Sequence, residues 1–156
     1  MITLDEWKKI FPEKFVSEKE VFSRINRGDS IFIGSACAEP QYLVHALIRY
    51  VKSHPKAFVD AEVLHIRTLG VAPYADEKFK QNFRHNSFFI GDTTRDAVNK
   101  GIADYTPVFL SKVPDLLYRG LARVDVALIQ TSMPDEPGFM SMGVSLDIVK
   151  AATEMA

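Results

Sequence analysis

A stretch of small residues between an apolar segment and a helical pattern has the composition of a ligand-binding loop. Residues 30–34 are mostly apolar, residues 34–38 are all small, and Glu39-Pro40 leads into the helical pattern. Small side chains let a ligand approach the backbone, and N–H groups before a helix can hold a carboxylate or thioester oxygen. The sequence therefore predicts substrate contacts at Gly34, Ser35, Ala36, Cys37, Ala38 and Glu39.

Other roles for this loop have less support from its residue types. A phosphate site would carry more glycines or a nearby Lys or Arg, whereas this loop has one glycine and the acidic Glu39. A helix amino terminus favours a thiolate at Cys37, but a nucleophile also needs a base, and His45 falls on the polar face of the next helix. The favoured interpretations are a buried core cysteine at Cys37 and a helix cap at Glu39.

A second candidate position follows the clearest strand pattern in the chain, VDVALIQT at residues 124–131. Gln130, Thr131 and Ser132 end that pattern. Parallel sheets bind ligands at the carboxyl ends of their strands. We therefore predict further substrate contacts at Gln130 and Ser132.

Histidines offer no clear catalytic or metal-binding constellation. His65 and Arg67 alternate onto one face of a strand pattern, and a partly buried structural pair is the favoured interpretation. No set of His, Cys, Asp and Glu has the spacing of a metal site, so we predict no metal.

Composition limits the classes of protein that the chain can belong to. Its 156 residues are 47% hydrophobic, enough for the core of one domain. The 19 basic and 20 acidic residues nearly cancel, which argues against a nucleic-acid groove or a basic membrane-binding patch. With one cysteine, no apolar run of membrane-spanning length and a charged start, the sequence predicts a soluble, cytoplasmic protein.

The candidate residues need a scaffold of alternating strands and helices. Apolar and alternating runs predict strands at residues 30–34, 61–69, 87–90, 106–110, 124–131 and 139–144, and helical patterns fall between several of them. This order is typical of an α/β fold with an open, mainly parallel sheet and flanking helices. A last helix is expected to start near Ser145 and shows no stop signal, which suggests that residues 1–156 are the front part of a longer protein.

Four separated segments carry a resemblance to a known family. They are IFIGSACAEPQYLVHAL, TLGVAPYADEKFKQNFRHNSFFIGD, GIADYTPVFLSKVPDLL and VDVALIQTSMPDEPGFMSMGVSLDIVKAA. In this order they resemble the amino-terminal half of the acetyl-CoA hydrolase/transferase family, and the resemblance runs from about residue 5 to the end. It implies an α/β domain of the type shared by CoA-transferases and sugar-phosphate isomerases, with residues 1–156 as an incomplete amino-terminal CoA-transferase domain.

The resemblance also implies a reaction. Family members move coenzyme A from an acyl-CoA to a carboxylate, in a site between two similar domains. A glutamate attacks the thioester, and an acyl-glutamyl anhydride and then a glutamyl-CoA thioester follow. That glutamate lies in the second domain, so no catalytic residue is carried over to this chain. The loop at residues 34–40 is carried over as a wall that faces the acyl or carboxylate substrate.

The expected partners follow from the same resemblance. They are an acyl-CoA, a short-chain carboxylate such as 4-hydroxybutyrate or acetate, and the carboxyl-terminal half of the same enzyme. Coenzyme A is then a substrate, and no resident cofactor is expected. A homo-oligomer is expected because a lone domain exposes apolar surface. The alternatives are a fragment of an acetyl-CoA hydrolase, a non-catalytic domain that binds a small acid, and a hydrolase with Cys37 as nucleophile.

Overall fold

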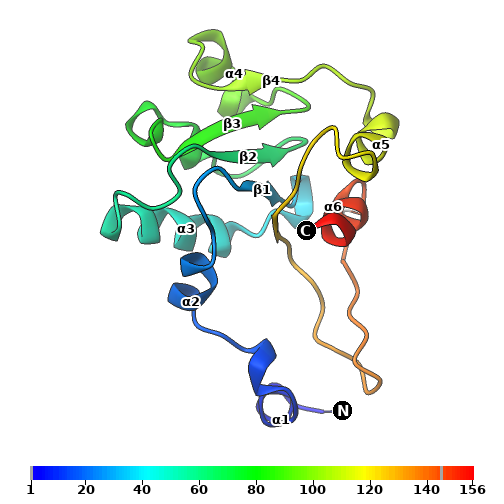
Figure 1. The fold of residues 1–156 in the computed structure, drawn as a ribbon. Helices are drawn as coiled ribbons and strands as arrows, with labels where there is room; N and C mark the ends of the chain where they lie inside the picture. The colour runs from blue at the N-terminus through cyan, green and yellow to red at the C-terminus, as the bar shows by residue number, and fades with distance from the viewer. Residues whose placement is uncertain (1, 145) are drawn as a thin grey trace.

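The computed structural model describes residues 2–144 and 146–156, and its centre is a five-stranded sheet (Figure 1). The strands lie in the order β4-β3-β2-β1-β5, and each neighbouring pair is parallel. Their bounds are β1 Ser30–Ile33, β2 Ala61–His65, β3 Phe83–Ser87, β4 Asp104–Tyr105 and β5 Val126–Leu128. The predicted α/β class with an open parallel sheet is confirmed.

Helices flank this sheet on two sides. The α-helices of the described residues are α1 Leu4–Ile10, α2 Glu18–Ser23, α3 Gln41–Ser53, α4 Asp92–Asn99, α5 Val113–Tyr118 and α6 Val149–Met155, of which α1 lies away from the sheet. Figure 1 shows α2 and α3 on one side of the sheet and α5 and α6 together on the other. In the described part of the chain, no helix has the length and apolar character needed to cross a membrane.

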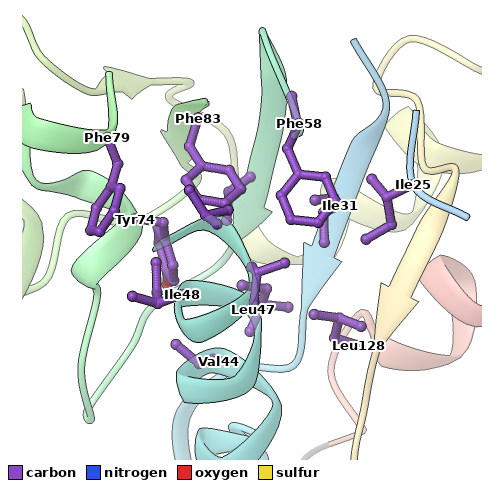
Figure 2. Close-up of a cluster of buried hydrophobic side chains, with 14 of the residues drawn as sticks. Ile25, Ile31, Val44, Leu47, Ile48, Phe58, Tyr74, Phe79, Phe83 and Leu128 are labelled. Atoms are coloured by element: carbon purple, nitrogen blue, oxygen red, sulfur yellow. The ribbon is translucent and has the colours of Figure 1, made fainter. Parts of the chain in front are cut away.

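The first core cluster lies between the sheet and α3. Side chains of β1 that point to this face, such as Ile31, pack against the buried stripe of α3, which includes Val44 and Leu47 (Figure 2). The stripe repeats at helical spacing, so α3 buries one side and exposes the other. Because β1 leads directly into the loop and α3, this packing fixes both ends of residues 34–40.

The second core cluster covers the opposite face. Phe32 and Leu64, which alternate with the residues of the first cluster, pack against side chains of α5 and α6 that include Leu117 and Ala152. Strands buried on both faces read as continuous apolar runs, which explains why residues 30–33 were recognisable in the sequence. Polar groups that could bind a ligand are therefore expected at the two ends of the strands.

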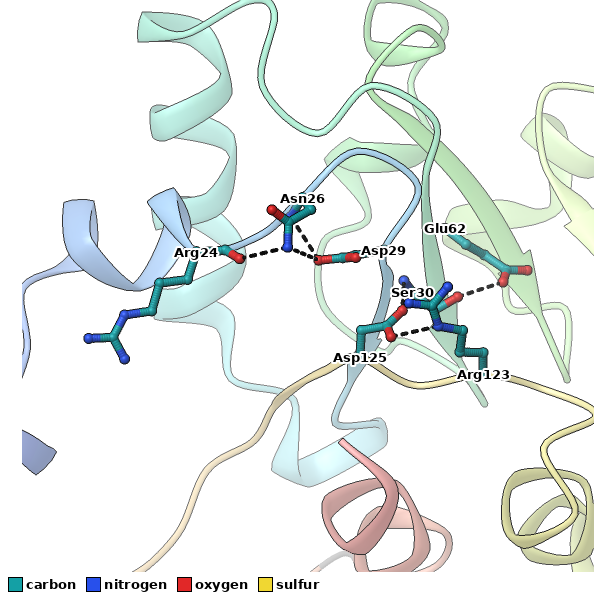
Figure 3. A network of polar contacts seen from close by, with 7 residues as sticks. All are labelled: Arg24, Asn26, Asp29, Ser30, Glu62, Arg123 and Asp125. Carbon is teal, nitrogen blue, oxygen red and sulfur yellow. Dashed lines mark hydrogen bonds and ion pairs between the residues drawn. The ribbon is translucent and has the colours of Figure 1, made fainter.

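Polar groups at the amino ends of the strands are largely bonded to one another (Figure 3). The Ser30 backbone N–H donates to Asp125 at 2.8 Å, and Arg123 donates to the same carboxylate at 2.6 Å. The Ser30 hydroxyl donates to Glu62 at 3.0 Å, and Asn86 donates to the other Glu62 oxygen at 3.1 Å. This edge is a structural network, whereas the candidate residues lie at the opposite, carboxyl edge.

Replacing Asp125 with alanine should lower the free energy of unfolding of the chain by about 1–3 kcal/mol, because the Ser30 N–H loses its acceptor. Chemical denaturation of the purified chain measures this change. The matched control is Asp115→Ala, since Asp115 is an exposed residue whose one ion pair among the described residues is with Lys112. Equal effects of the two substitutions would show that the network in Figure 3 contributes nothing specific.

Most of the expected strands differ from the structure in their bounds or are absent. Those predicted at residues 61–69 and 124–131 are the shorter β2 and β5. The strand predicted at residues 87–90 is β3 at Phe83–Ser87, because the polar run FRHNS forms the strand and the apolar run follows it. The strand predicted at 106–110 is the short β4, Asp104–Tyr105. Residues 139–144 form no strand. They belong to an arm without helix or strand, residues 129–144, in which the Ser132 N–H donates to Ser141 O. The helix expected near Ser145 is α6, which begins at Val149; Ser145 itself lies outside the described residues.

Candidate functional site

The predicted binding loop, residues 34–40, is fastened to both neighbouring strands. The Gly34 N–H donates to Leu128 O of β5 at 2.9 Å, and the Ala36 N–H donates to Arg67 O, just past β2, at 3.0 Å. The Ser35 hydroxyl oxygen accepts the Ile66 N–H at 3.0 Å. The loop thus closes the carboxyl end of β1, between β2 and β5, the position at which parallel sheets bind ligands.

Backbone conformation decides which loop residues reach solvent. Ala36 has a φ of 52°, in the left-handed region that a non-glycine residue rarely adopts, and it starts a single 3-10 turn, Ala36–Ala38. A Cβ at Gly34 would lie 3.1 Å from Ala38 O, so glycine permits this close return of the chain. Cys37 is exposed, and the favoured interpretation as a buried core cysteine is wrong because the turn directs it outward.

Two backbone donors remain on this turn. Within residues 2–144 and 146–156, the N–H groups of Ser35 and Cys37 have no hydrogen-bond acceptor. Backbone N–H groups held by a rigid turn are suited to a developing oxyanion or a carboxylate, since they need no reorganisation. Cys37 is exposed and Ala36 is half-buried, whereas Gly34, Ser35, Ala38 and Glu39 are buried, so contacts from this loop to a substrate stay a prediction.

Glu39 lies almost fully inside, with 6% of its surface exposed. The Thr68 hydroxyl and the Gly70 N–H both donate to its Oε2, the latter at 3.2 Å, and its Oε1 has no partner in the described part of the chain. Pro40 is the residue that precedes α3, and no side chain caps that helix. The interpretation of Glu39 as a helix cap is therefore wrong, and its carboxyl group instead ties residues 34–40 to residues 68–70.

Gly70 makes room for this contact. A Cβ at Gly70 would lie 2.7 Å from Gln41 Nε2 and 3.0 Å from Glu39 Oε1. A larger residue would therefore push against both side chains. The glycine-containing segment after β2 and the small-residue loop after β1 form one connected structure.

Behind this structure lies a buried polar chain that sequence reasoning missed. Tyr74 OH and His65 Nδ1 are 2.9 Å apart, His65 Nε2 and Ser87 Oγ are 3.2 Å apart, and Ser87 Oγ and His85 Nε2 are 2.7 Å apart. His85 Nδ1 lies 3.2 Å from Val63 O. The signal was available, because His65 and His85 both occupy inward positions of neighbouring strands, but only the pairing of β2 with β3 brings them together.

The carbonyl group of Val63 determines which atom carries the proton in each side chain of this hydrogen-bonded series. Val63 O only accepts, so His85 Nδ1 donates and, in a neutral ring, its Nε2 accepts from Ser87. Ser87 then accepts from His65 Nε2, and His65 Nδ1 accepts from Tyr74. Each of the four side chains then has a hydrogen-bond partner, and every bond is donated in the same direction, from Tyr74 towards Val63 O.

Burial keeps these groups uncharged. It lowers the pKa of His85 to about 4 and holds the pKa of His65 well below its usual value, where the nearby His85 adds a smaller effect. Burial first and the Glu39 carboxylate second raise the pKa of Tyr74. Because their ring nitrogens are engaged, neither His65 nor His85 is free to act as a base for Cys37.

The predicted pair of His65 and Arg67 does not form. His65 is buried within β2, whereas Arg67 lies beyond the strand end with its guanidinium carbon 5.8 Å from the centre of the Phe89 ring. The strand was predicted to extend to residue 69, but β2 ends at His65, and strict alternation no longer holds after that residue.

The second candidate position, residues 130–132, lies on the segment that leaves the sheet after β5. Gln130 is exposed after β5, and Ser132 lines a groove of about 700 Å³ with apolar residues of α1 and the arm, including Trp7, Phe11 and Met140. The Trp7 indole N–H is buried there and has no acceptor in the described residues. Contacts from Gln130 and Ser132 to a substrate stay a prediction.

Metal ligation has no candidate within residues 2–144 and 146–156, where no group of three or more His, Cys, Asp and Glu side chains could hold an ion. The arrangement at the carboxyl edge instead offers backbone donors, an exposed thiol and a buried carboxyl group. These groups can bind and orient an acyl or carboxylate group. They do not by themselves make a pair of nucleophile and base.

Residues 2–156 match the family described as acetyl-CoA hydrolase/transferase N-terminal domain. A 4-hydroxybutyrate coenzyme A transferase of Clostridium kluyveri is 41% identical over 97% of this chain and 34% of its own length. A succinyl-CoA:acetate/propanoyl-CoA:succinate CoA transferase of Fasciola hepatica is 38% identical over 94% of this chain and 30% of its own. The chain thus spans about a third of the length of these curated relatives.

Solved structures share the fold. A 4-hydroxybutyrate CoA-transferase of Porphyromonas gingivalis has a TM-score of 0.71 and 24% identity, with 96% of this chain and 33% of that chain covered. RipA of Yersinia pestis has a TM-score of 0.75 and 22% identity, with 88% and 33% covered. These likenesses support the CoA-transferase type of α/β domain.

Proposed function

Because this chain belongs to the acetyl-CoA hydrolase/transferase family, we propose that it is the amino-terminal part of an enzyme that moves CoA between an acyl-CoA and a short-chain carboxylate. The observation that supports this most strongly is the family match over residues 2–156, together with two relatives named as CoA transferases. Coenzyme A is a substrate in this proposal, and the enzyme needs no resident cofactor.

The proposed reaction uses a glutamate outside this chain, as the family resemblance implies. Its carboxylate attacks the acyl-CoA carbonyl, an acyl-glutamyl anhydride forms and CoA leaves as thiolate. The thiolate then attacks the glutamyl carbonyl, which gives a glutamyl-CoA thioester and releases the first carboxylate. The acceptor carboxylate repeats these steps in reverse, so atoms and charge balance without another reactant.

In this proposal, the chain supplies one wall of the site. The N–H groups of Ser35 and Cys37 hold an oxygen of the acyl group, and the small side chain of the half-buried Ala36 leaves space for the substrate to approach the turn. Glu39 fixes the position of this wall through Thr68 and Gly70. Rigid attachment to β2 and β5 supports this role, because oxyanion donors act best when already in position.

The acceptor in this proposal is a short-chain acid, and the names of the two relatives support hydroxy acids, dicarboxylic acids and simple fatty acids as candidates. The Clostridium relative is named for 4-hydroxybutyrate, and the Fasciola relative is named for succinate, acetate and propanoate. Hydrolysis of an acyl-CoA is the second candidate activity, because the family description includes hydrolases and water can intercept the glutamyl thioester.

The proposal includes a cytoplasmic location and two protein partners. The carboxyl-terminal part of the enzyme supplies the nucleophile, and a second copy makes a homo-oligomer. Exposed apolar side chains support further protein contacts, with Phe139 74% and Val144 84% exposed on the arm. The exposed free Cys37 is consistent with a reducing compartment.

The test is an assay of the full-length protein with acetyl-CoA as donor and 4-hydroxybutyrate, succinate or water as acceptor. Mass spectrometry of the products separates transfer from hydrolysis. The proposal expects the acyl-CoA of the added acid to form faster than free CoA is released. Release of free CoA at the same rate with and without acid would instead support the hydrolase.

A further inference from the structure

Arg67 is a cation just beyond the carboxyl end of β2, and no carboxylate among the described residues forms an ion pair with it. Its Nε is buried without an acceptor within residues 2–144 and 146–156. Other arginines differ, since Arg84 pairs with Asp104 and Arg95 with Asp92. Arg67 is half-buried, and a buried Nε donor without a partner is costly, so its presence calls for a role.

The side chain of Arg67 packs against two residues, Phe89 and Gly91, that fit its shape. Its guanidinium carbon lies 5.8 Å from the centre of the Phe89 ring, and Phe89 is 56% exposed. A Cβ at Gly91 would come within 3.3 Å of both Arg67 Cγ and Thr68 O, so the glycine leaves the space that the arginine stem uses. The aromatic ring and the missing Cβ hold the guanidinium in place before any ligand arrives.

The position of Arg67 connects it to the predicted binding loop. Its carbonyl oxygen accepts the Ala36 N–H at 3.0 Å, and the next residue, Thr68, donates to Glu39. The backbone of Arg67 is therefore joined to the wall assigned to the acyl group, while its side chain lies against Phe89 and Gly91 beyond the end of β2.

Resting on the proposed function, we infer that Arg67 binds the far end of the acid substrate, and that it selects short acids with an oxygen function at that end, a second carboxylate most strongly. A guanidinium donates two parallel hydrogen bonds to a carboxylate and fewer to a hydroxyl. The far end is favoured because the reacting carboxylate loses its charge during transfer, and a tight ion pair to it would stabilise the ground state.

Three four-carbon acids test this selection, since succinate, 4-hydroxybutyrate and butyrate differ only at the far carbon. The full-length protein is assayed with acetyl-CoA as donor, and kcat/KM is measured for each acceptor. In Arg67→Gln, the preference for succinate over butyrate should fall by about 10- to 100-fold, and the preference for 4-hydroxybutyrate by less. Butyrate should change by less than about threefold, which is within the range of a neutral surface change.

Two further variants sharpen the result. Arg67→Lys should keep part of the preference for succinate, because it keeps the charge and loses the two-pronged geometry. Arg95→Gln is the matched control, since it removes an exposed arginine that is paired with Asp92, and it should leave all three acceptors unchanged.

The remaining outcomes would overturn the inference. Equal losses for all three acceptors would assign Arg67 to the fold or to the contact with the carboxyl-terminal part. A raised KM for acetyl-CoA that disappears with the dephospho form would make a CoA phosphate its ligand. An unchanged preference would leave Arg67 without this role. Transfer to none of the acids by the unsubstituted protein would remove the proposed function, and the inference with it.

Discussion

Replacing Glu39 with alanine should lower the free energy of unfolding of the chain by about 2–4 kcal/mol. The substitution leaves the Thr68 hydroxyl and the Gly70 N–H without their acceptor in a buried position, and each such loss costs about 1–3 kcal/mol. In the full-length protein, transfer by the folded fraction should fall by about 100-fold, because residues 34–40 lose their attachment to residues 68–70. Denaturant titration and a transfer assay measure the two effects.

Two variants separate the contact from the mere loss of a side chain. Glu39→Gln keeps an oxygen acceptor for both donors and should recover most of the stability. Glu20→Ala removes an exposed glutamate paired with Arg24 and should change the unfolding free energy by less than about 1 kcal/mol. A Glu39→Ala chain as stable as the Glu20→Ala chain would show that the buried carboxyl group does not fasten the loop.

The two buried histidines should make the chain sensitive to acid. In the folded state they stay neutral below the usual histidine pKa of 6.5, with the pKa of His85 at about 4 and that of His65 well below 6.5. The unfolded chain therefore binds more protons as the pH falls from 6.5 towards 4, and folding loses about 1.4 kcal/mol per pH unit for each histidine. Between pH 7 and pH 5, the free energy of unfolding should fall by about 2–4 kcal/mol.

The proton positions give this prediction a second measurement. NMR of the histidine rings should show His85 protonated at Nδ1 and His65 at Nε2, with neither ring titrating near pH 6.5. His45→Gln is the matched control: it removes an exposed histidine, keeps both buried rings and should keep the acid slope. Titration of either buried ring near pH 6.5, or a free energy of unfolding that does not change between pH 7 and pH 5, would contradict the assignment of both rings as buried, neutral and hydrogen-bonded.

Local patterns predicted the elements whose burial is continuous. The apolar run at Ser30–Ile33 and the stripe of Val44, Leu47 and Val51 identified β1 and α3, because each is buried in the way its period implies. These two elements position residues 34–40, so the place of the binding loop could be predicted as well. The parallel sheet followed from the alternation of strands and helices.

Features that depend on distant partners could not be predicted. FRHNS at Phe83–Ser87 has polar side chains that are satisfied by His65 and Val63 of the neighbouring strand, and because of this local polarity the strand was predicted only from residue 87. Glu39 obeyed the local rule for a helix cap, yet its partners Thr68 and Gly70 lie about thirty residues away. Met140, Met142 and Val144 alternate like one face of a strand, but residues 139–144 form none, and Met140 and Val144 are exposed to solvent.

The most direct test of the central claim is transfer by separated parts. Residues 1–156 and a separately purified carboxyl-terminal part are incubated with acetyl-CoA and 4-hydroxybutyrate, each alone and then mixed, and the formation of 4-hydroxybutyryl-CoA is followed. We expect transfer only in the mixture, with the glutamyl-CoA thioester trapped on the carboxyl-terminal part. Transfer by residues 1–156 alone would contradict the account and place a nucleophile, first Cys37 or Glu39, within this chain.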